Sequence, residues 1–234
     1  MNLRPFWRYY GGKWRAAPRY PAPGFDTIVE PFAGAAGYAL RHSQMRVILV
    51  EKYHVVAEVW RYLIGVKESE VRAIPCVDAV EDLPRCLPDG ARWLVGFNLS
   101  SGIVEPKLTL SAGCRRLRAA GRDYYGWSPR ARERVASQLA AIRHWRVIEG
   151  DYTAAPDVEA TWFVDPPYDG AGRLYKHPAS AIDFAALSQW CRTRPGQTIV
   201  CEAAGATWLP FRRLHRSQRN GLTGAATVEC IWTA

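Results

Sequence analysis

The stretch from Ala160 to Gly170, ATWFVDPPYDG, decides the fold that the sequence predicts. Its apolar residues run unbroken from Trp162 to Val164 and stop at Asp165, which is typical of a buried central strand that ends in a polar loop. The two prolines that follow have no backbone N–H, so the loop cannot continue the sheet and its carbonyls remain free acceptors. Asp165 adds a carboxylate, and Tyr168 adds a flat aromatic face. An ordinary strand-ending turn would fit the same residues.

Outward from this stretch, apolar runs typical of strands alternate with amphipathic patterns typical of helices. We predict further strands at 27–29, 46–50, 146–149, 197–202, 211–216 and 227–232. We predict helices that begin at Tyr38, span 53–64, run from Ser128 through Ile142, and span 184–192 behind the N-cap Asp183. This order predicts an α/β protein with a Rossmann-like, mostly parallel sheet that contains one antiparallel strand.

Composition limits the function classes. With 234 residues, 48% of them hydrophobic, the chain can form one sizeable domain with a small insertion. The net charge of +9 favours a polyanionic partner, although a merely basic surface fits as well. The six cysteines form no Cys-x-x-Cys pair, so no metal site or disulfide framework is indicated, and we expect Cys201 and Cys230 to pack as small hydrophobes in a cytoplasmic protein. No apolar run approaches the ~20 residues of a membrane span.

A glycine-rich turn, Glu30 to Gly37, follows the strand at 27–29. A strand, a glycine turn and a helix in this order place backbone N–H groups at the carboxyl edge of a sheet, where they can hold a polar ligand. Glu51 closes the next strand about twenty residues later, where doubly wound folds bind the ribose hydroxyls of a nucleoside. A solvated strand end would also explain Glu51.

Two further stretches combine polar and aromatic residues. Residues Arg8 to Arg15, RYYGGKWR, offer glycines for close approach to a ligand, aromatic walls and the charge of Lys13, but a flexible basic arm has the same composition. At the end of the strand at 146–149, Asp151 can accept a hydrogen bond from a ligand amine or stabilise a turn.

The segment from about 66 to 126 loses the alternation of strand and helix. It interleaves basic and aromatic residues, a mixture that can follow phosphates and touch bases, although a solvated basic loop is an equal alternative. The candidate nucleic-acid contacts are Lys107, Arg115, Arg116, Arg118, Arg122, Tyr124 and, beyond this segment, Lys176.

These motifs together resemble the Dam-type class of S-adenosylmethionine-dependent DNA adenine-N6 methyltransferases. The resemblance rests on Tyr10-Gly11-Gly12-Lys13, Glu30-Pro31-Phe32-x-Gly34, Glu51, Gly150-Asp151-Tyr152 and Asp165-Pro166-Pro167-Tyr168, in that order. It implies a class I methyltransferase fold in which 1–65 and 127–234 form the catalytic domain and 66–126 is an inserted target-recognition segment. The implied partner is double-stranded DNA, as in restriction-modification, without a metal or a membrane.

The resemblance also implies roles for individual residues. The target adenine would be held by Asp165, Pro166, Pro167 and Tyr168. The cofactor S-adenosyl-L-methionine would contact Tyr10, Lys13, Glu30, Phe32, Gly34, Glu51, Asp151, Tyr152 and Asp165. Ala35 and Ala36 stand where such enzymes usually continue with glycines, so we expect a different pose or weaker binding of the cofactor's amino-acid end.

The chemistry of adenine methylation suits these residue types. The exocyclic amine is a poor nucleophile because its lone pair is delocalised into the ring, so the site must accept hydrogen bonds that turn this lone pair toward the sulfonium methyl group. Asp165 and the Pro166 carbonyl can do so, and Tyr168 can stack on a base flipped out of the duplex. Methylation of RNA adenine or of the cytosine amine, and a catalytically silent DNA-binding module, remain alternatives.

Overall fold

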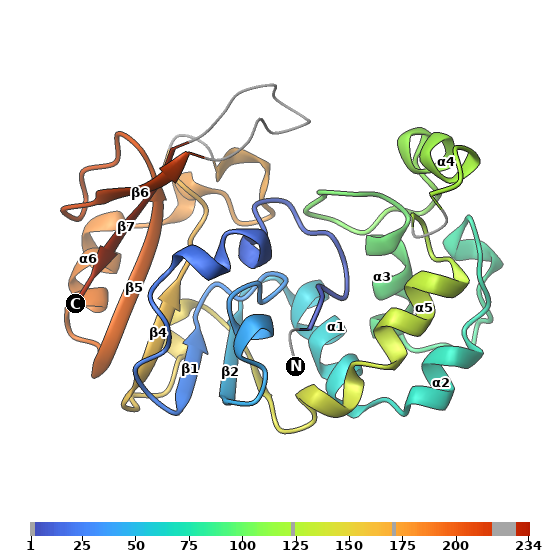
Figure 1. The fold of residues 1–234 in the computed structure, drawn as a ribbon, viewed down its shortest axis with the longest axis horizontal. Coiled ribbons are helices and arrows are strands. Elements are labelled where there is room, and N and C mark those ends of the chain that lie inside the picture. The colour runs from blue at the N-terminus through green and yellow to red at the C-terminus, as the bar shows by residue number, and fades with distance from the viewer. Residues whose placement is uncertain (1–2, 123–124, 170–171, 217–227) are drawn as a thin grey trace.

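One sheet forms the centre of the molecule (Figure 1). The computed structural model describes residues 3–122, 125–169, 172–216 and 228–234, and within them seven strands lie in the order β3-β2-β1-β4-β5-β7-β6. The strands are β1 (Thr27–Glu30), β2 (Arg46–Glu51), β3 (Arg146–Glu149), β4 (Ala160–Val164), β5 (Gly196–Ala203), β6 (Arg212–Arg216) and β7 (Val228–Thr233). β7 runs antiparallel to both of its neighbours, and the other neighbouring pairs are parallel. The predicted mostly parallel sheet with one antiparallel strand is confirmed.

This strand order is that of the class I methyltransferase fold. From β1 the chain adds β2 and β3 on one side of the sheet, and β4 and β5 follow on the other side. The order therefore reverses between β1 and β4. In open α/β sheets, such a reversal leaves a crevice at the carboxyl ends of the two strands, where ligands bind.

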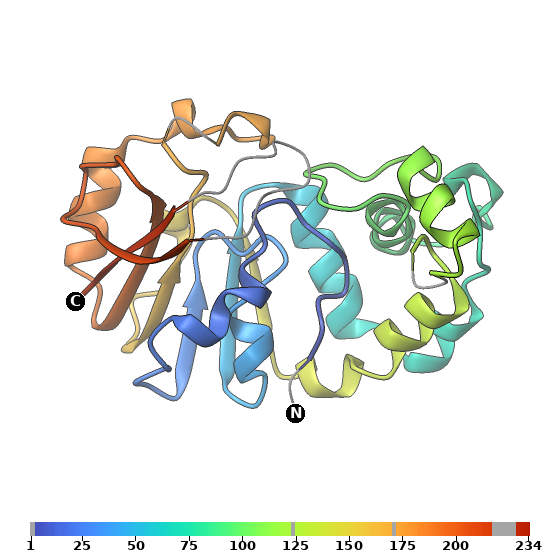
Figure 2. The ribbon, with the colours of Figure 1, turned by 45° about the horizontal axis from the view of Figure 1, so that its top comes forward.

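Helices cover both faces of the sheet (Figure 2). Val47 and Leu49 of β2 pack in one core cluster with α1 (His54–Gly65), while Ile48 and Val50 face the cluster that contains α6 (Phe184–Arg192). This division follows from the pleat, since successive side chains of a strand point to opposite faces. Val56, Trp60 and Leu63 lie at helical spacing along one face of α1 and are fully buried.

Two predicted helix starts are confirmed by their caps. The Asp183 side chain accepts a hydrogen bond from Ala186 N at 3.0 Å, and Ser128 caps α5 (Pro129–Ala136) in the same way. The prediction of one continuous helix through Ile142 is wrong. α5 stops at Ala136, and a separate 3₁₀ turn (Leu139–Ile142) follows after Gln138, whose side chain hydrogen-bonds the backbone of Arg4.

The prediction of an α-helix after the glycine turn is also wrong. The chain forms only a 3₁₀ helix (Ala39–His42) before β2 begins at Arg46. The Glu30 carboxylate accepts a hydrogen bond from Ala39 N at 2.6 Å, so a buried side chain takes the N–H at the start of this short turn. The Ala39 N–H, one of the backbone donors that the sequence assigned to a helix N-terminus, is therefore used within the protein.

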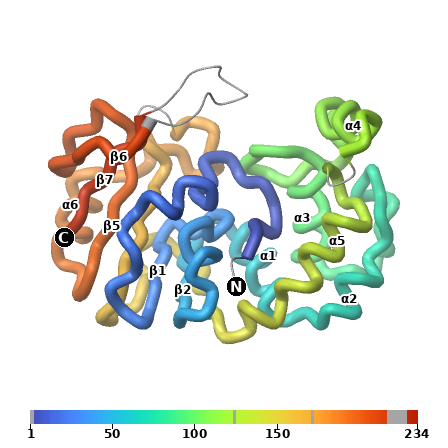
Figure 3. The backbone as a smooth tube through the Cα atoms, in the orientation of Figure 1, coloured from blue at the N-terminus to red at the C-terminus, as the bar shows by residue number. Residues whose placement is uncertain are grey.

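Segment 66–126 combines short helices with long loops and lies beside the sheet (Figure 3). It contains α2 (Glu68–Ala73), α3 (Asp89–Asn98) and α4 (Ala112–Ala119). α3 packs against α1, and its side chains Leu94 and Phe97 are fully buried in the same cluster as α1. The apolar part of this segment therefore forms part of the core, and its exposed basic residues include Arg115 and Arg116 on α4.

The N-terminal segment is an ordered part of the fold. Phe6 and Trp7 are fully buried, and Tyr9 forms a parallel bridge with Ile103. The alternative of a flexible arm is therefore wrong. Short 3₁₀ helices complete the structure at Lys13–Arg15, Ala17–Arg19, Val80–Asp82, Tyr152–Ala154, Gly172–Leu174 and Ala179–Ala181.

Two further findings concern composition. Cys201 and Cys230 are buried, as predicted for cysteines that act as small hydrophobes. In the described part of the chain, no helix combines the length and the apolar character that crossing a membrane requires.

Candidate functional site

A cavity of about 290 Å³ lies at the carboxyl ends of β1, β2 and β4. Three carboxylates reach it from these strand ends: Glu30, Glu51 and Asp165. Of the residues that the sequence predicted, those in its wall are Tyr10, Lys13, Glu30, Phe32, Gly34, Glu51, Asp151, Tyr152, Asp165, Pro167 and Lys176. The predicted cofactor residues thus share one cavity at the reversal of strand order. Pro166 and Tyr168 are not part of its wall.

Glu51 is held rigidly at the end of β2. One of its oxygens accepts a hydrogen bond from Gly34 N and the other from Tyr53 N, each at 2.8 Å. Burial raises the pKa of this carboxyl, and the backbone N–H groups oppose the effect. Because each carboxylate oxygen can accept two hydrogen bonds, Glu51 keeps acceptor capacity for adjacent hydroxyl groups of a ligand.

The glycine turn contains two residues with positive φ angles, and one of them is an alanine. Gly34 and Ala36 have φ angles of +46° and +49°, in the left-handed region that favours glycine. An L-residue there costs about 1 to 2 kcal/mol, which the surrounding structure must offset at Ala36. Ala35 lines the cavity, whereas Ala36 is fully buried.

Gly37 lets the N-terminal segment cross the turn at close range. A Cβ atom there would lie 2.5 Å from Trp14 N and 2.8 Å from Lys13 N, both of them backbone atoms that cannot move aside independently. The missing side chain therefore allows the approach that delivers Lys13 into the cavity.

Lys13 contacts the loop of Asp165, Pro166, Pro167 and Tyr168, which we call the acceptor corner. Its Nζ lies 2.7 Å from Asp165 Oδ1 and 4.6 Å from the centroid of the Tyr168 ring, and it donates a hydrogen bond to Gly11 O at 3.1 Å. The Tyr168 hydroxyl donates to Glu229 Oε1, which also accepts from Tyr20. Lys13 was predicted as a cofactor contact. It does line the cavity, but its closest partner is Asp165.

Burial and charge set the protonation of this corner. Burial raises the pKa of Asp165 to about 6, while the charge of Lys13 opposes that rise. Burial lowers the pKa of Lys13, but the charges of Asp165 and Glu229 outweigh it and raise the pKa overall. Burial also raises the pKa of Glu30 to about 8. At neutral pH, Asp165 is mainly ionised, Lys13 is an ammonium, and Glu30 is mainly protonated.

The end of the cavity next to β3 has an aromatic wall. The rings of Phe32 and Tyr152 stack with centroids 5.7 Å apart and an interplanar angle of 26°. Asp151 forms an ion pair with Lys52 at 2.9 Å, and both side chains are substantially exposed. An exposed pair of this kind contributes only about 0 to 1 kcal/mol, so a ligand can displace it and reach Asp151.

Several site residues were not predicted. The Tyr175 hydroxyl donates to Tyr10 O at 3.2 Å and lies so close to Gly11 that a side chain there would collide with it. Tyr175 belongs to no motif, so its position in the cavity wall has no local sequence signal. Glu229 could have been noticed, because an acidic residue inside the apolar run of β7 needs a buried partner.

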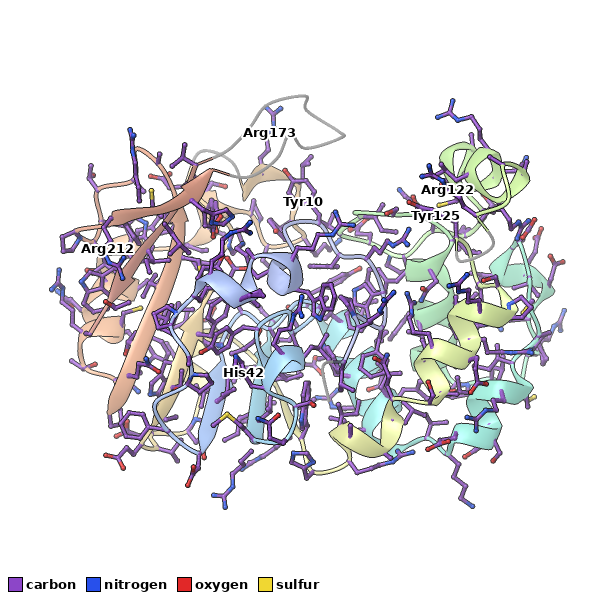
Figure 4. All side chains as sticks on the ribbon, in the orientation of Figure 1. Tyr10, His42, Arg122, Tyr125, Arg173 and Arg212 are labelled. Atoms are coloured by element: carbon purple, nitrogen blue, oxygen red, sulfur yellow. The ribbon has the colours of Figure 1, made fainter. Side chains whose placement is uncertain are left out.

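The predicted nucleic-acid contacts differ in their surroundings. Lys107, Arg115, Arg116 and Arg122 are exposed, and Figure 4 shows Arg122 beside α4. Arg118 instead makes two hydrogen bonds with the Asp78 carboxylate, at 2.8 and 2.5 Å. Lys176 lines the cavity, and its Nζ lies 3.9 Å from Glu105 Oε1. Tyr124 lies outside the described residues.

The strand order defines the fold class of the chain, which is that of the class I methyltransferase fold. The sequence matches no family model and no curated protein. Among solved structures, it is similar to the rRNA methyltransferase aviRa from Streptomyces viridochromogenes. One structure of that protein is 16% identical, over 92% of this chain and 80% of that chain, with a TM-score of 0.39. A second is 14% identical, over 93% and 80%, with a TM-score of 0.37.

Proposed function

We propose that the protein is an S-adenosylmethionine-dependent methyltransferase that methylates the exocyclic amine of adenine in DNA. One observation carries this proposal: a single cavity holds the Gly34 turn and Glu51 together with the acceptor corner at Asp165. Both halves of a methyl-transfer site would thus open into the same space.

The residues present fit the cofactor. Glu51 retains acceptor capacity for the two ribose hydroxyls, the wall of Phe32 and Tyr152 suits the adenine ring, and the Gly34 turn allows close approach of the amino-acid end. The bound cofactor would supply a methyl group on a positively charged sulfur.

Asp165 would act on the methyl-accepting amine. Its carboxylate accepts a hydrogen bond from the amine, which frees the nitrogen lone pair for attack, and it stabilises the positive charge that develops on nitrogen. The excess proton then leaves to solvent. Tyr168 is fixed by its hydroxyl bond to Glu229, and its ring would stack on the target base from a position next to the cavity wall.

DNA is proposed as the substrate on the basis of the motifs. The exposed arginines at and after α4 support a polyanionic partner, since they can contact phosphates. The adenine amine is the same in DNA and RNA, so the test of this proposal uses separate DNA and RNA substrates.

The test is transfer of a tritiated methyl group to separate samples of duplex DNA, single-stranded DNA and RNA, followed by nucleoside analysis. We expect label in N6-methyldeoxyadenosine, and an Asp165→Asn variant at least about a hundredfold less active, as for loss of one essential hydrogen-bonding group. Asp157→Asn is the matched control, because Asp157 is an exposed aspartate that pairs with Arg194. Label in RNA or cytosine would correct the substrate, and no label in any nucleic acid would refute the proposal.

A further inference from the structure

The Lys13 ammonium lies where the substrate amine would otherwise find its acceptor. Its Nζ faces Asp165 Oδ1 at 2.7 Å, Gly11 O at 3.1 Å and Glu229 Oε1 at 3.9 Å, and its side chain is only 10% exposed. An ammonium has three N–H donors and no acceptor, so these three oxygens match its donors in number. Lys13 lines the cavity, but its ammonium is already paired with oxygens of the protein.

The two oxygens of Asp165 have different surroundings. Oδ1 is itself buried against Lys13, whereas the Asp165 side chain as a whole remains 19% exposed. The exposed part of the side chain is therefore not Oδ1, and Oδ2 is the carboxylate oxygen that we assign to a ligand. Asp165 also lines the cavity.

Asp165 is surrounded by acidic groups from three strands. Glu30 reaches it electrostatically from β1, Glu202 from β5 and Glu229 from β7. The Tyr168, Tyr175, Tyr20 and Cys201 side chains also interact with it. Each is neutral at pH 7, since its ordinary pKa already lies above 7 and burial raises it further. Burial and the charge of Glu229 raise the pKa of Asp165. The charge and hydrogen bond of Lys13, the cation in contact, lower it, and a hydrogen bond from Tyr168 also lowers it.

We propose that Lys13 is a positioning residue that keeps the Asp165 carboxylate ionised and holds its Oδ1, so that Oδ2 is left to accept a hydrogen bond from the methyl-accepting amine. A protonated Asp165 would lose this acceptor and the charge that stabilises the developing cation. The role on the amine rests on the proposed function, whereas the ionisation of Asp165 does not.

The backbone around Lys13 supports a fixed position. The Trp14 indole N–H donates to Leu3 O at 2.6 Å, and the Arg41 guanidinium lies 3.6 Å from the centroid of the Trp14 rings. The close packing of the Lys13 and Trp14 backbone against Gly37 also holds this segment in place. Lys13 also cannot replace the substrate as methyl acceptor, because its nitrogen lone pair is protonated.

The direct test follows the Asp165 carboxyl by NMR in protein labelled with ¹³C at aspartate, with Asp165→Asn to assign the signal. We expect the wild-type carboxyl to titrate near pH 6. In Lys13→Met and Lys13→Gln its pKa should rise by about one to three pH units, the effect of losing one adjacent opposite charge, and Lys13→Arg should stay closer to the wild type. Lys52→Met removes a cavity lysine that pairs with Asp151, and it should leave the Asp165 titration unchanged. An unchanged titration in both neutral Lys13 variants would overturn the proposal.

The pH profile of kcat/KM gives the second readout. With such a rise in pKa, the fraction of Asp165 that is ionised at pH 7 falls by about two- to a hundredfold. The acid limb of the Lys13→Gln profile should therefore move to higher pH, and activity should recover at alkaline pH. A uniform loss at every pH would contradict the positioning role while leaving the methyltransferase proposal intact. If the NMR shift appears but the wild-type protein transfers no methyl group, the proposed function fails and the charge role of Lys13 stands.

Discussion

Glu30 is a buried acid that the fold holds mainly in its protonated form. It is 2% exposed, and it accepts the hydrogen bond from Ala39 N that begins the short turn after β1. Burial raises its pKa to about 8, and the nearby Asp165 adds to that rise while Lys13 opposes it. Its role is therefore to fix the turn that lines the cavity, in addition to any contact with a ligand.

This raised pKa predicts a stability effect of Glu30→Gln. The folded state prefers the protonated acid, so the stability it contributes is complete below the ordinary pKa of 4.5 and is lost as the pH rises through about 8. Gln stays neutral, so the variant and the wild type should have similar free energies of unfolding at pH 4.5, and the variant should be more stable by up to a few kcal/mol at pH 9. Urea denaturation across this range measures the difference. A difference that stays constant with pH would contradict the raised pKa.

At the scale of elements, α4 is the part of the chain best suited to phosphates. Its residues Arg115 and Arg116 are exposed, whereas Arg118 is paired with Asp78. The buried Cys114 and the Ser111 N-cap anchor the helix on the remaining structure. The arrangement separates arginines available to a partner from one that fixes the helix.

We therefore predict that replacing both Arg115 and Arg116 by Gln lowers the salt dependence of DNA binding. Each lost phosphate contact should reduce the slope of log K against log salt concentration by about 0.9, so the double variant should lose about 1.8. Fluorescence anisotropy at several salt concentrations gives the slope. Arg46→Gln, at the opposite end of β2 from the cavity, is the control and should keep the wild-type slope. Equal slopes in the double variant and the wild type would exclude α4 as a phosphate contact.

The elements themselves were largely predictable because their signals are local. Strands such as β4 appear as apolar runs, and the caps Ser128 and Asp183 mark helix starts. The failures came from tertiary contacts. The Glu30 side chain of β1 accepts a hydrogen bond from Ala39 N, where the sequence predicted the start of a helix. The Gln138 side chain donates to Arg4 O, at the point where the helix of α5 was expected to continue.

At the scale of the whole molecule, the site was predictable where it depends on topology. Because parallel strands end at the same edge, Glu30, Glu51 and Asp165 could be placed together from the strand order alone. The pairing of Lys13 with Asp165 and the packing of Tyr175 over Gly11 could not, because each joins distant segments without a shared pattern. These contacts depend on how the N-terminal segment crosses the finished sheet.

The central claim is that this cavity binds S-adenosylmethionine beside the acceptor corner, and isothermal titration calorimetry tests it most directly. We predict that the wild-type protein binds the cofactor and that Glu51→Gln binds it about ten- to a hundredfold more weakly, as for loss of a hydrogen bond to a charged group. Glu149→Gln is the matched control, because Glu149 lies opposite Glu51 on the neighbouring strand β3 but outside the cavity wall. This variant should bind the cofactor like the wild type. No binding by the wild type, or equal affinity in the Glu51 variant, would contradict the claim.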